Sequence, residues 1–164
     1  MRKIAIIMGS DSDLPTVERG INVLREYGVP FEVHVYSAHR TPTEAAEFVK
    51  GAEKNGFGVI IAAAGMAAHL AGAVAANTVL PVIGIPMSSK NTGGVDALLS
   101  TVQMPSGIPV ATVAIDGATN AALLAMEILA LSEQSLAEKL KEAREAGARK
   151  VLVKNKEIEE KYNS

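Results

Sequence analysis

The feature that most constrains the fold is a repeated alternation of short apolar runs with longer amphipathic stretches. The apolar runs are rich in β-branched residues and are bounded by Gly, Pro or Ser, as is typical of buried strands. They cover Lys3–Met8, Pro30–Tyr36, Val59–Ala63, Pro81–Pro86 and Pro109–Ile115. The amphipathic stretches predict helices over Leu14–Tyr27, Thr43–Asn55, Ala68–Asn77, Val95–Val102 and Thr119–Leu131.

Such alternation is typical of a parallel sheet whose right-handed crossovers place helices on both faces. We therefore predict an α/β three-layer sandwich, with a flavodoxin-like parallel five-stranded sheet of order 2-1-3-4-5. The 164 residues suit a single domain, with residues 1–131 as the core. Residues 132–164 contain eight Lys or Arg and seven Asp or Glu among helix formers, which predicts a solvated C-terminal helical arm.

The middle of the chain is unusually poor in charge. Residues 59–131 hold only Lys90, Asp96, Asp116 and Glu127 as formal charges and no aromatic residue. A small domain needs more polar cover than this, so we expect the region to contact other subunits of a symmetric homo-oligomer. Segment 88–108 is the part expected to reach a neighbour's ligand. The alternative is a monomer whose small residues pack internally.

Composition and missing motifs exclude several functions. A formal charge of −2 provides no positive field for nucleic acid or an anionic membrane. The chain has no cysteine and no apolar run near the roughly 20 residues of a membrane span, so we expect a soluble cytoplasmic protein. The G-x-G-x-x-G, G-x-x-x-x-G-K-[ST] and G-x-S-x-G motifs are absent, and His34, His39 and His69 lack close metal-ligand spacing. We predict no cofactor and no metal.

Ligands of open parallel sheets bind beyond the carboxyl ends of the strands where the strand order reverses, here between the first and third strands. The first loop at that edge is Gly9-Ser10-Asp11-Ser12-Asp13. Its aspartates would repel phosphate, so one of them is better suited to accept hydrogen bonds from sugar hydroxyls. Alternatively, Ser12 or Asp13 is simply the N-cap of the next helix, with Pro15 in its first turn.

The second loop is Ser37-Ala38-His39-Arg40-Thr41-Pro42. Thr41 and Glu44 fit a capping box with Pro42 at the first helical position. This leaves Arg40 beside a helix N-terminus, where its planar donors suit phosphate, and His39 next to it as a proton donor and acceptor. Either residue can instead be an ordinary solvated side chain.

The third loop, residues 64–72, is composed mainly of Ala and Gly around Met66 and His69. Small residues let a flat ligand approach the backbone, whose amides can bind a carboxylate or an oxyanion. The alternatives are tight helix packing for the small residues and a buried core position for His69.

Four ordered motifs closely resemble the N5-carboxyaminoimidazole ribonucleotide mutase family of purine biosynthesis. They are Gly-Ser-Asp-Ser-Asp at 9–13, Ser-Ala-His-Arg-Thr-Pro at 37–42, Ala-Gly-Met-Ala-Ala-His-Leu at 64–70, and the segment from Gly94 to Thr112. The resemblance implies a homo-octamer without a cofactor that converts N5-carboxyaminoimidazole ribonucleotide into 4-carboxyaminoimidazole ribonucleotide and back. It also implies His39 as the catalytic residue, Arg40 as the phosphate ligand, and further substrate contacts from Ser10, Asp13, Ser37, Ala64, Gly65, Met66, Ala67, Ala68 and His69.

Two departures and two alternatives accompany this resemblance. Met66 stands where the family often has a second glycine, and Ala71 where it often has proline. A related carboxylase class, which uses aminoimidazole ribonucleotide and free CO2, tends to carry Arg-Ser-Asn in the third loop, so His69 favours the mutase. A non-catalytic nucleotide-binding module of the same fold is the other alternative.

Our main hypothesis is that CO2 leaves the carbamate nitrogen and is held until the ring carbon attacks it, with His39 moving both protons.

Overall fold

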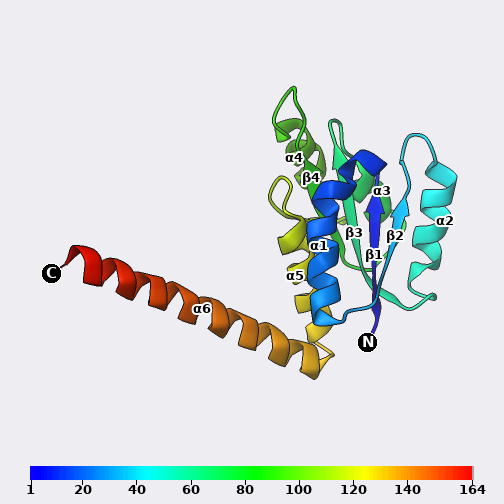
Figure 1. Cartoon of the computed structure of the whole chain (residues 1–164). Coiled ribbons are helices and arrows are strands. Elements are labelled where there is room, and N and C mark those ends of the chain that lie inside the picture. Colours follow the sequence, from blue (N-terminus) through cyan, green and yellow to red (C-terminus); the bar gives the residue numbers. More distant parts are fainter. Residues whose placement is uncertain (164) are drawn as a thin grey trace.

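A computed structural model describes residues 1–163 and has a sheet of five parallel strands in the order β2-β1-β3-β4-β5. The strand order and the fold class predicted from the sequence are thus confirmed. The strands are β1 (Lys3–Met8), β2 (Phe31–Val35), β3 (Phe57–Gly65), β4 (Val82–Met87) and β5 (Ala111–Thr112). Their carboxyl ends lie along one edge of the sheet (Figure 1).

Helices cover both faces of this sheet. Helices α1 (Leu14–Tyr27) and α5 (Ala118–Ala130) share one hydrophobic core with alternate residues of the central strands. Helices α2 (Pro42–Ala52), α3 (Leu70–Ala75) and α4 (Val95–Val102) cover the opposite face. The close packing of α1 on α5 depends on Gly20, because a Cβ there would lie 2.6 Å from the carbonyl oxygen of Ala118.

The charged C-terminal segment forms the long helix α6 (Gln134–Tyr162), as predicted. Figure 1 shows that it leaves the α/β body and extends away from it, with the C-terminus at its far end. Leu136 and Leu140 are its buried residues, and both belong to the core on the α1 and α5 face. Within residues 1–163, no helix combines the length and apolar character that a membrane span requires.

The predicted strand bounds were wrong at the third and fifth strands. β3 is longer than Val59–Ala63 because its pairing with β1 begins at Phe57 and its pairing with β4 continues to Gly65. β5 is much shorter than Pro109–Ile115 because it lies at the sheet edge and pairs only with β4. Pro109 has no N–H group for the ladder.

The predicted helix over 68–77 was also too long. Met66 adopts a left-handed φ of 58°, and its carbonyl accepts a 2.7 Å hydrogen bond from the Ala68 N–H. This tight turn delays the start of α3 to Leu70. At the other end, the Asn77 side-chain amide donates to the carbonyl of Ala73, and the helix stops at Ala75.

Candidate active site

Four strand-to-helix loops surround a cavity of about 560 Å³ at the carboxyl edge of the sheet. This volume falls in the range of small-molecule sites. Every residue that we predicted for the site lines the cavity, together with several that we did not predict. The lining residues are Gly9, Ser10, Ser12, Asp13, Ser37, Ala38, His39, Arg40, Ala64, Gly65, Met66, Ala67, Ala68, His69, Leu70, Ser88 and Ser89.

The first loop is folded by Ser10. Its hydroxyl accepts hydrogen bonds from the Ser12 N–H at 3.3 Å and the Ser12 hydroxyl at 2.8 Å, which caps a short 3-10 turn over Asp11–Asp13. The alternative that Ser12 or Asp13 is the N-cap of the next helix is confirmed for Asp13, with Pro15 in the first turn of that helix. Asp13 occupies the N-cap position of α1 but makes no side-chain capping bond. Asp13 lines the cavity, where its carboxylate can accept hydrogen bonds from a ligand.

The Asp13 carboxylate sits in an unfavourable environment for a negative charge. Partial burial raises its pKa, and the nearby charges of Asp116 and Asp11 raise it further, while a hydrogen bond with the Ser10 backbone partly opposes them. The ionised group therefore destabilises the folded chain without ligand at neutral pH. Such a cost is typical of a residue kept for binding.

Replacing Asp13 by Asn is expected to stabilise the unliganded protein while weakening nucleotide binding. Because the folded pKa is raised, the gain in melting temperature should be largest at pH 7 and should shrink as the pH falls through that pKa. Affinity should fall at least about tenfold, since hydrogen bonds to charged groups contribute about 1.5–3 kcal/mol. Thermal denaturation between pH 4 and pH 7 and calorimetric titration check both effects. A pH-independent change in melting temperature would contradict the argument.

Ser37 and Thr41 fix the turn that carries His39 and Arg40. The Ser37 hydroxyl accepts hydrogen bonds from the backbone N–H groups of His39 at 3.3 Å and Arg40 at 3.2 Å. The Thr41 hydroxyl in turn accepts from the Ser37 N–H at 2.9 Å. The predicted capping box of Thr41 and Glu44 is therefore wrong, because this turn uses the Thr41 hydroxyl instead. The predicted helix start at Pro42 is right.

The two side chains of this turn are exposed at the cavity. Arg40 reaches across to the first loop, where its Nη2 donates a 3.0 Å hydrogen bond to the carbonyl of Gly9. This contact holds the guanidinium near the switch point between β1 and β3 and leaves its other N–H donors for a ligand. His39 lies one residue before it on the same fixed turn.

The third loop combines small side chains with two larger exposed residues, Met66 and His69. Met66 is 64% exposed, and its left-handed backbone costs about 1 kcal/mol relative to glycine. This explains physically why a glycine suits the position. His69 occupies the N-cap position of α3 and is exposed, so the alternative that it is a buried core histidine is wrong.

Sequence reasoning missed the fourth loop as part of this cavity. Ser88 and Ser89 follow β4 directly and line the cavity of their own chain, whereas we expected this segment to serve a neighbouring subunit. The Ser88 N–H donates a 2.8 Å hydrogen bond to the Asp116 carboxylate, which fixes the loop start. The sequence did carry a signal for this loop, because Ser88 and Ser89 follow a predicted fourth parallel strand. The carboxyl ends of all parallel strands lie at the same edge of the sheet.

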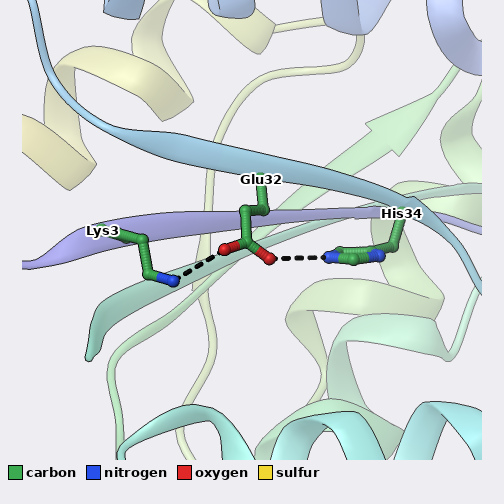
Figure 2. Close-up of polar contacts among 3 residues, drawn as sticks. All are labelled: Lys3, Glu32 and His34. Carbon is green, nitrogen blue, oxygen red and sulfur yellow. Dashed lines mark hydrogen bonds and ion pairs between the residues drawn. The ribbon is translucent and has the colours of Figure 1, made fainter. Parts of the chain in front are cut away.

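The remaining histidine, His34, has a structural role away from the cavity. Figure 2 shows the Glu32 carboxylate between Lys3 and His34, at 2.7 Å from Lys3 Nζ and 3.5 Å from His34 Nε2. The hydrogen bond from Lys3 is the main reason that the pKa of Glu32 is lowered. The His34 ring also stacks on Tyr36, with 5.4 Å between centroids.

A larger cavity of about 810 Å³ lies between residues 75–82 and 107–111. Its lining consists of Ala, Asn, Thr, Val, Leu, Pro, Gly and Ile, and none of these side chains titrates near neutral pH. Of these two cavities, only the smaller one is lined by side chains that can transfer a proton near neutral pH, such as His39, His69 and Asp13.

Comparisons with known proteins agree over nearly the whole chain. A sequence model of the AIR carboxylase family matches residues 3–150. The chain is 57% identical over 157 residues to the N5-carboxyaminoimidazole ribonucleotide mutase of Pyrococcus horikoshii, covering 96% of this chain and 89% of that protein. It is 49% identical over 160 residues to the protein of the same name from Thermotoga maritima, covering 98% and 94%. The crystal structure of Treponema denticola PurE superposes with a TM-score of 0.84 at 30% identity, covering 99% of both chains.

Proposed function

Because this chain belongs to the AIR carboxylase family, we propose that the cavity at the carboxyl edge of its sheet is the active site of a mutase, with His39 as its proton-transfer group. The chain is an isomerase that interconverts N5-carboxyaminoimidazole ribonucleotide and 4-carboxyaminoimidazole ribonucleotide in purine biosynthesis. The free-CO2 carboxylase and the non-catalytic module are not favoured.

The observation that carries the proposal is the shared turn of His39 and Arg40. One hydrogen-bonded turn places a proton-transfer group and a phosphate-suited cation side by side at the rim of a cavity of nucleotide size. A nucleotide held by its phosphate at Arg40 would bring its base within the cavity. Asp13 then accepts hydrogen bonds from the ribose hydroxyls, with Ser10 and Ser37 as further polar contacts.

The isomerisation adds one proton to the exocyclic nitrogen and removes one proton from C4. When the bond between the carbamate carbon and the exocyclic nitrogen breaks, CO2 leaves and the nitrogen takes the proton of the His39 imidazolium. The neutral ring then attacks CO2 through C4, and the C4 proton returns to His39. The loop of residues 64–69 lines this region with backbone amides and, apart from Met66 and His69, with small side chains, which suits the retention of CO2 beside the ring.

An ultraviolet assay tests the activity directly. Mixing the protein with 4-carboxyaminoimidazole ribonucleotide should change the absorbance as the isomer forms, at pH values between about 6 and 8 where an ordinary histidine titrates. No change across this range would contradict the assignment and favour a binding module.

An isotope experiment separates the mutase from a free-CO2 carboxylase. The assay is repeated in buffer with dissolved ¹³C-bicarbonate. Retained CO2 predicts that both isomers stay unlabelled on the time scale of many turnovers. Label entering the product at the turnover rate would show exchange with free CO2 and would overturn the mutase mechanism.

We further propose a homo-octamer in the cytoplasm. Support for assembly comes from apolar side chains left exposed on the chain: Val95, Leu99 and Val102 form a stripe along α4, and Val79 and Leu131 are about 90% exposed. Exposed apolar stripes of this kind mark subunit contacts. The cytoplasm suits a pathway of charged, phosphorylated intermediates, because such molecules are retained by the membrane.

Light scattering at micromolar concentration should therefore give about eight times the 17.1 kDa chain mass. Replacing Leu99 by Glu places a charge in the α4 stripe and is expected to lower this mass, since a buried unpaired charge is costly. Asn22→Glu, on the exposed side of α1, adds the same charge and should leave the mass unchanged. A stable, active monomer would refute the assembly.

A further inference from the structure

The imidazole of His69 occupies the space that a side chain at position 72 would fill. A Cβ built on Gly72 would lie 2.3 Å from Cε1, 2.6 Å from Nε2 and 2.8 Å from Nδ1 of His69. Real Cβ contacts are essentially never this short, so the ring and any larger residue at position 72 exclude each other. The ring thus lies directly on the backbone of the first turn of α3, which Gly72 leaves bare.

A second element, α4, holds the same ring and the loop before it. The Nδ1 atom of His69 is 3.4 Å from the carbonyl oxygen of Ser100. The hydroxyl of Thr101, which is buried, is 2.7 Å from the Ala97 carbonyl and 3.4 Å from the Ala68 carbonyl. Adjacent residues of α4 therefore anchor His69 and its neighbour Ala68.

The Ser100 contact selects one tautomer of His69. A carbonyl oxygen only accepts hydrogen bonds, so Nδ1 must carry the proton in this contact. In a neutral imidazole, Nε2 is then unprotonated and acts as an acceptor. His69 is also one of the residues that line the cavity.

We propose that Gly72 and Ser100 are positioning residues for the isomerisation: they hold His69 in one place and in the Nδ1–H tautomer, so that Nε2 accepts an N–H or O–H hydrogen bond from the bound nucleotide. The proposal rests on the proposed function of the cavity. Small residues in this segment thus do more than allow helices to pack, because Gly72 makes room for a functional side chain.

The test is Gly72→Ala, with Gly147→Ala as the matched control. Both glycines lie inside helices, where alanine is the better helix former, and a Cβ at Gly147 meets nothing within 4 Å. Gly72→Ala should keep or raise the melting temperature, because the exposed His69 ring can swing away. Its kcat/KM should nevertheless fall about 10²-fold, as expected for a misplaced site group. Gly147→Ala should keep the wild-type kcat/KM.

A double mutant shows whether the loss acts through His69. In a His69→Ala background, Gly72→Ala should cause no further loss of kcat/KM, because the ring that it displaces is gone. The ¹⁵N spectrum of histidine-labelled protein should also show the His69 Nδ1–H tautomer in the wild type and its loss in Gly72→Ala.

Three outcomes would overturn the inference: near-normal kcat/KM in Gly72→Ala, an equal loss with and without His69, or a wild-type His69 protonated on Nε2 alone. A wild-type protein without isomerase activity is a different failure, because it contradicts the proposed function itself.

Discussion

Replacing His39 by Asn is expected to abolish turnover while leaving nucleotide binding measurable. Asparagine retains some polarity but has no titrating group, so no proton can reach the nitrogen or leave C4 at the required steps. General acid and base catalysis by a positioned side chain contributes about 10²–10⁴-fold to rate, and the kcat should fall by at least the lower figure. Arg40, Asp13 and the turn held by Ser37 remain, so calorimetric titration should still detect the nucleotide.

The matched control for this experiment is His34→Asn. It removes an imidazole from the same chain, but one that packs on Tyr36 and Phe48 and does not line the cavity. This imidazole lies beside Glu32 (Figure 2). This variant should lower the melting temperature and keep its kcat. Near-normal turnover in His39→Asn, or an equal loss of kcat in both variants, would remove His39 from the mechanism.

The position of the candidate site could be predicted from the sequence because it follows from topology. The apolar runs around Lys3–Met8 and Val59–Ala63 identified adjacent parallel strands with a reversal of order between them. That reversal alone directs attention to the loops after these strands. The chemistry at those loops then depends on residue types that are visible in the sequence, namely His39, Arg40 and Asp13.

The local hydrogen bonding could not be predicted in the same way. Thr41 has the right spacing for a capping box, yet its hydroxyl is hydrogen-bonded to the backbone N–H and carbonyl of Ser37 in the preceding turn. These local bonds compete with the capping bond for the same hydroxyl. Likewise, nothing in the spacing of His69 and Gly72 distinguishes a ring packed on a bare helix turn from a glycine that serves only helix packing. The placement of the His69 ring depends on tertiary neighbours, namely Ser100 and Thr101 of α4.

The site also carries costs that a purely structural loop would avoid. Met66 adopts a left-handed backbone without being glycine, and Asp13 is a partly buried carboxylate whose pKa is raised by burial and by Asp116. Both lie on the cavity rather than in the core. Backbone strain and the desolvation of a charge both lower the stability of the fold, and the rest of the structure must offset them. Their occurrence together at one cavity is typical of a functional site.

Replacing Arg40 by Ala is expected to weaken nucleotide binding at least about tenfold. The guanidinium is fixed by one hydrogen bond to the Gly9 carbonyl and presents its other donors beside the start of α2. Hydrogen bonds to a charged phosphate contribute about 1.5–3 kcal/mol each, and about 1.4 kcal/mol corresponds to a tenfold change in affinity. The loss should appear mainly in Kd and KM, because the phosphate is not a reacting group.

The conservative variant and a salt series make this expectation specific. Arg40→Lys keeps the charge but loses the planar fork, so its affinity should lie between those of the wild type and Arg40→Ala. Wild-type affinity should decrease with added salt, and Arg40→Ala should show a smaller decrease, since one charge pair is missing. Arg19→Ala, which removes the same charge from the exposed surface of α1, should leave both quantities unchanged. If Arg40→Ala binds as tightly as the wild type at every salt concentration, the phosphate must bind to another loop of the cavity, and the orientation of the nucleotide relative to His39 must be revised.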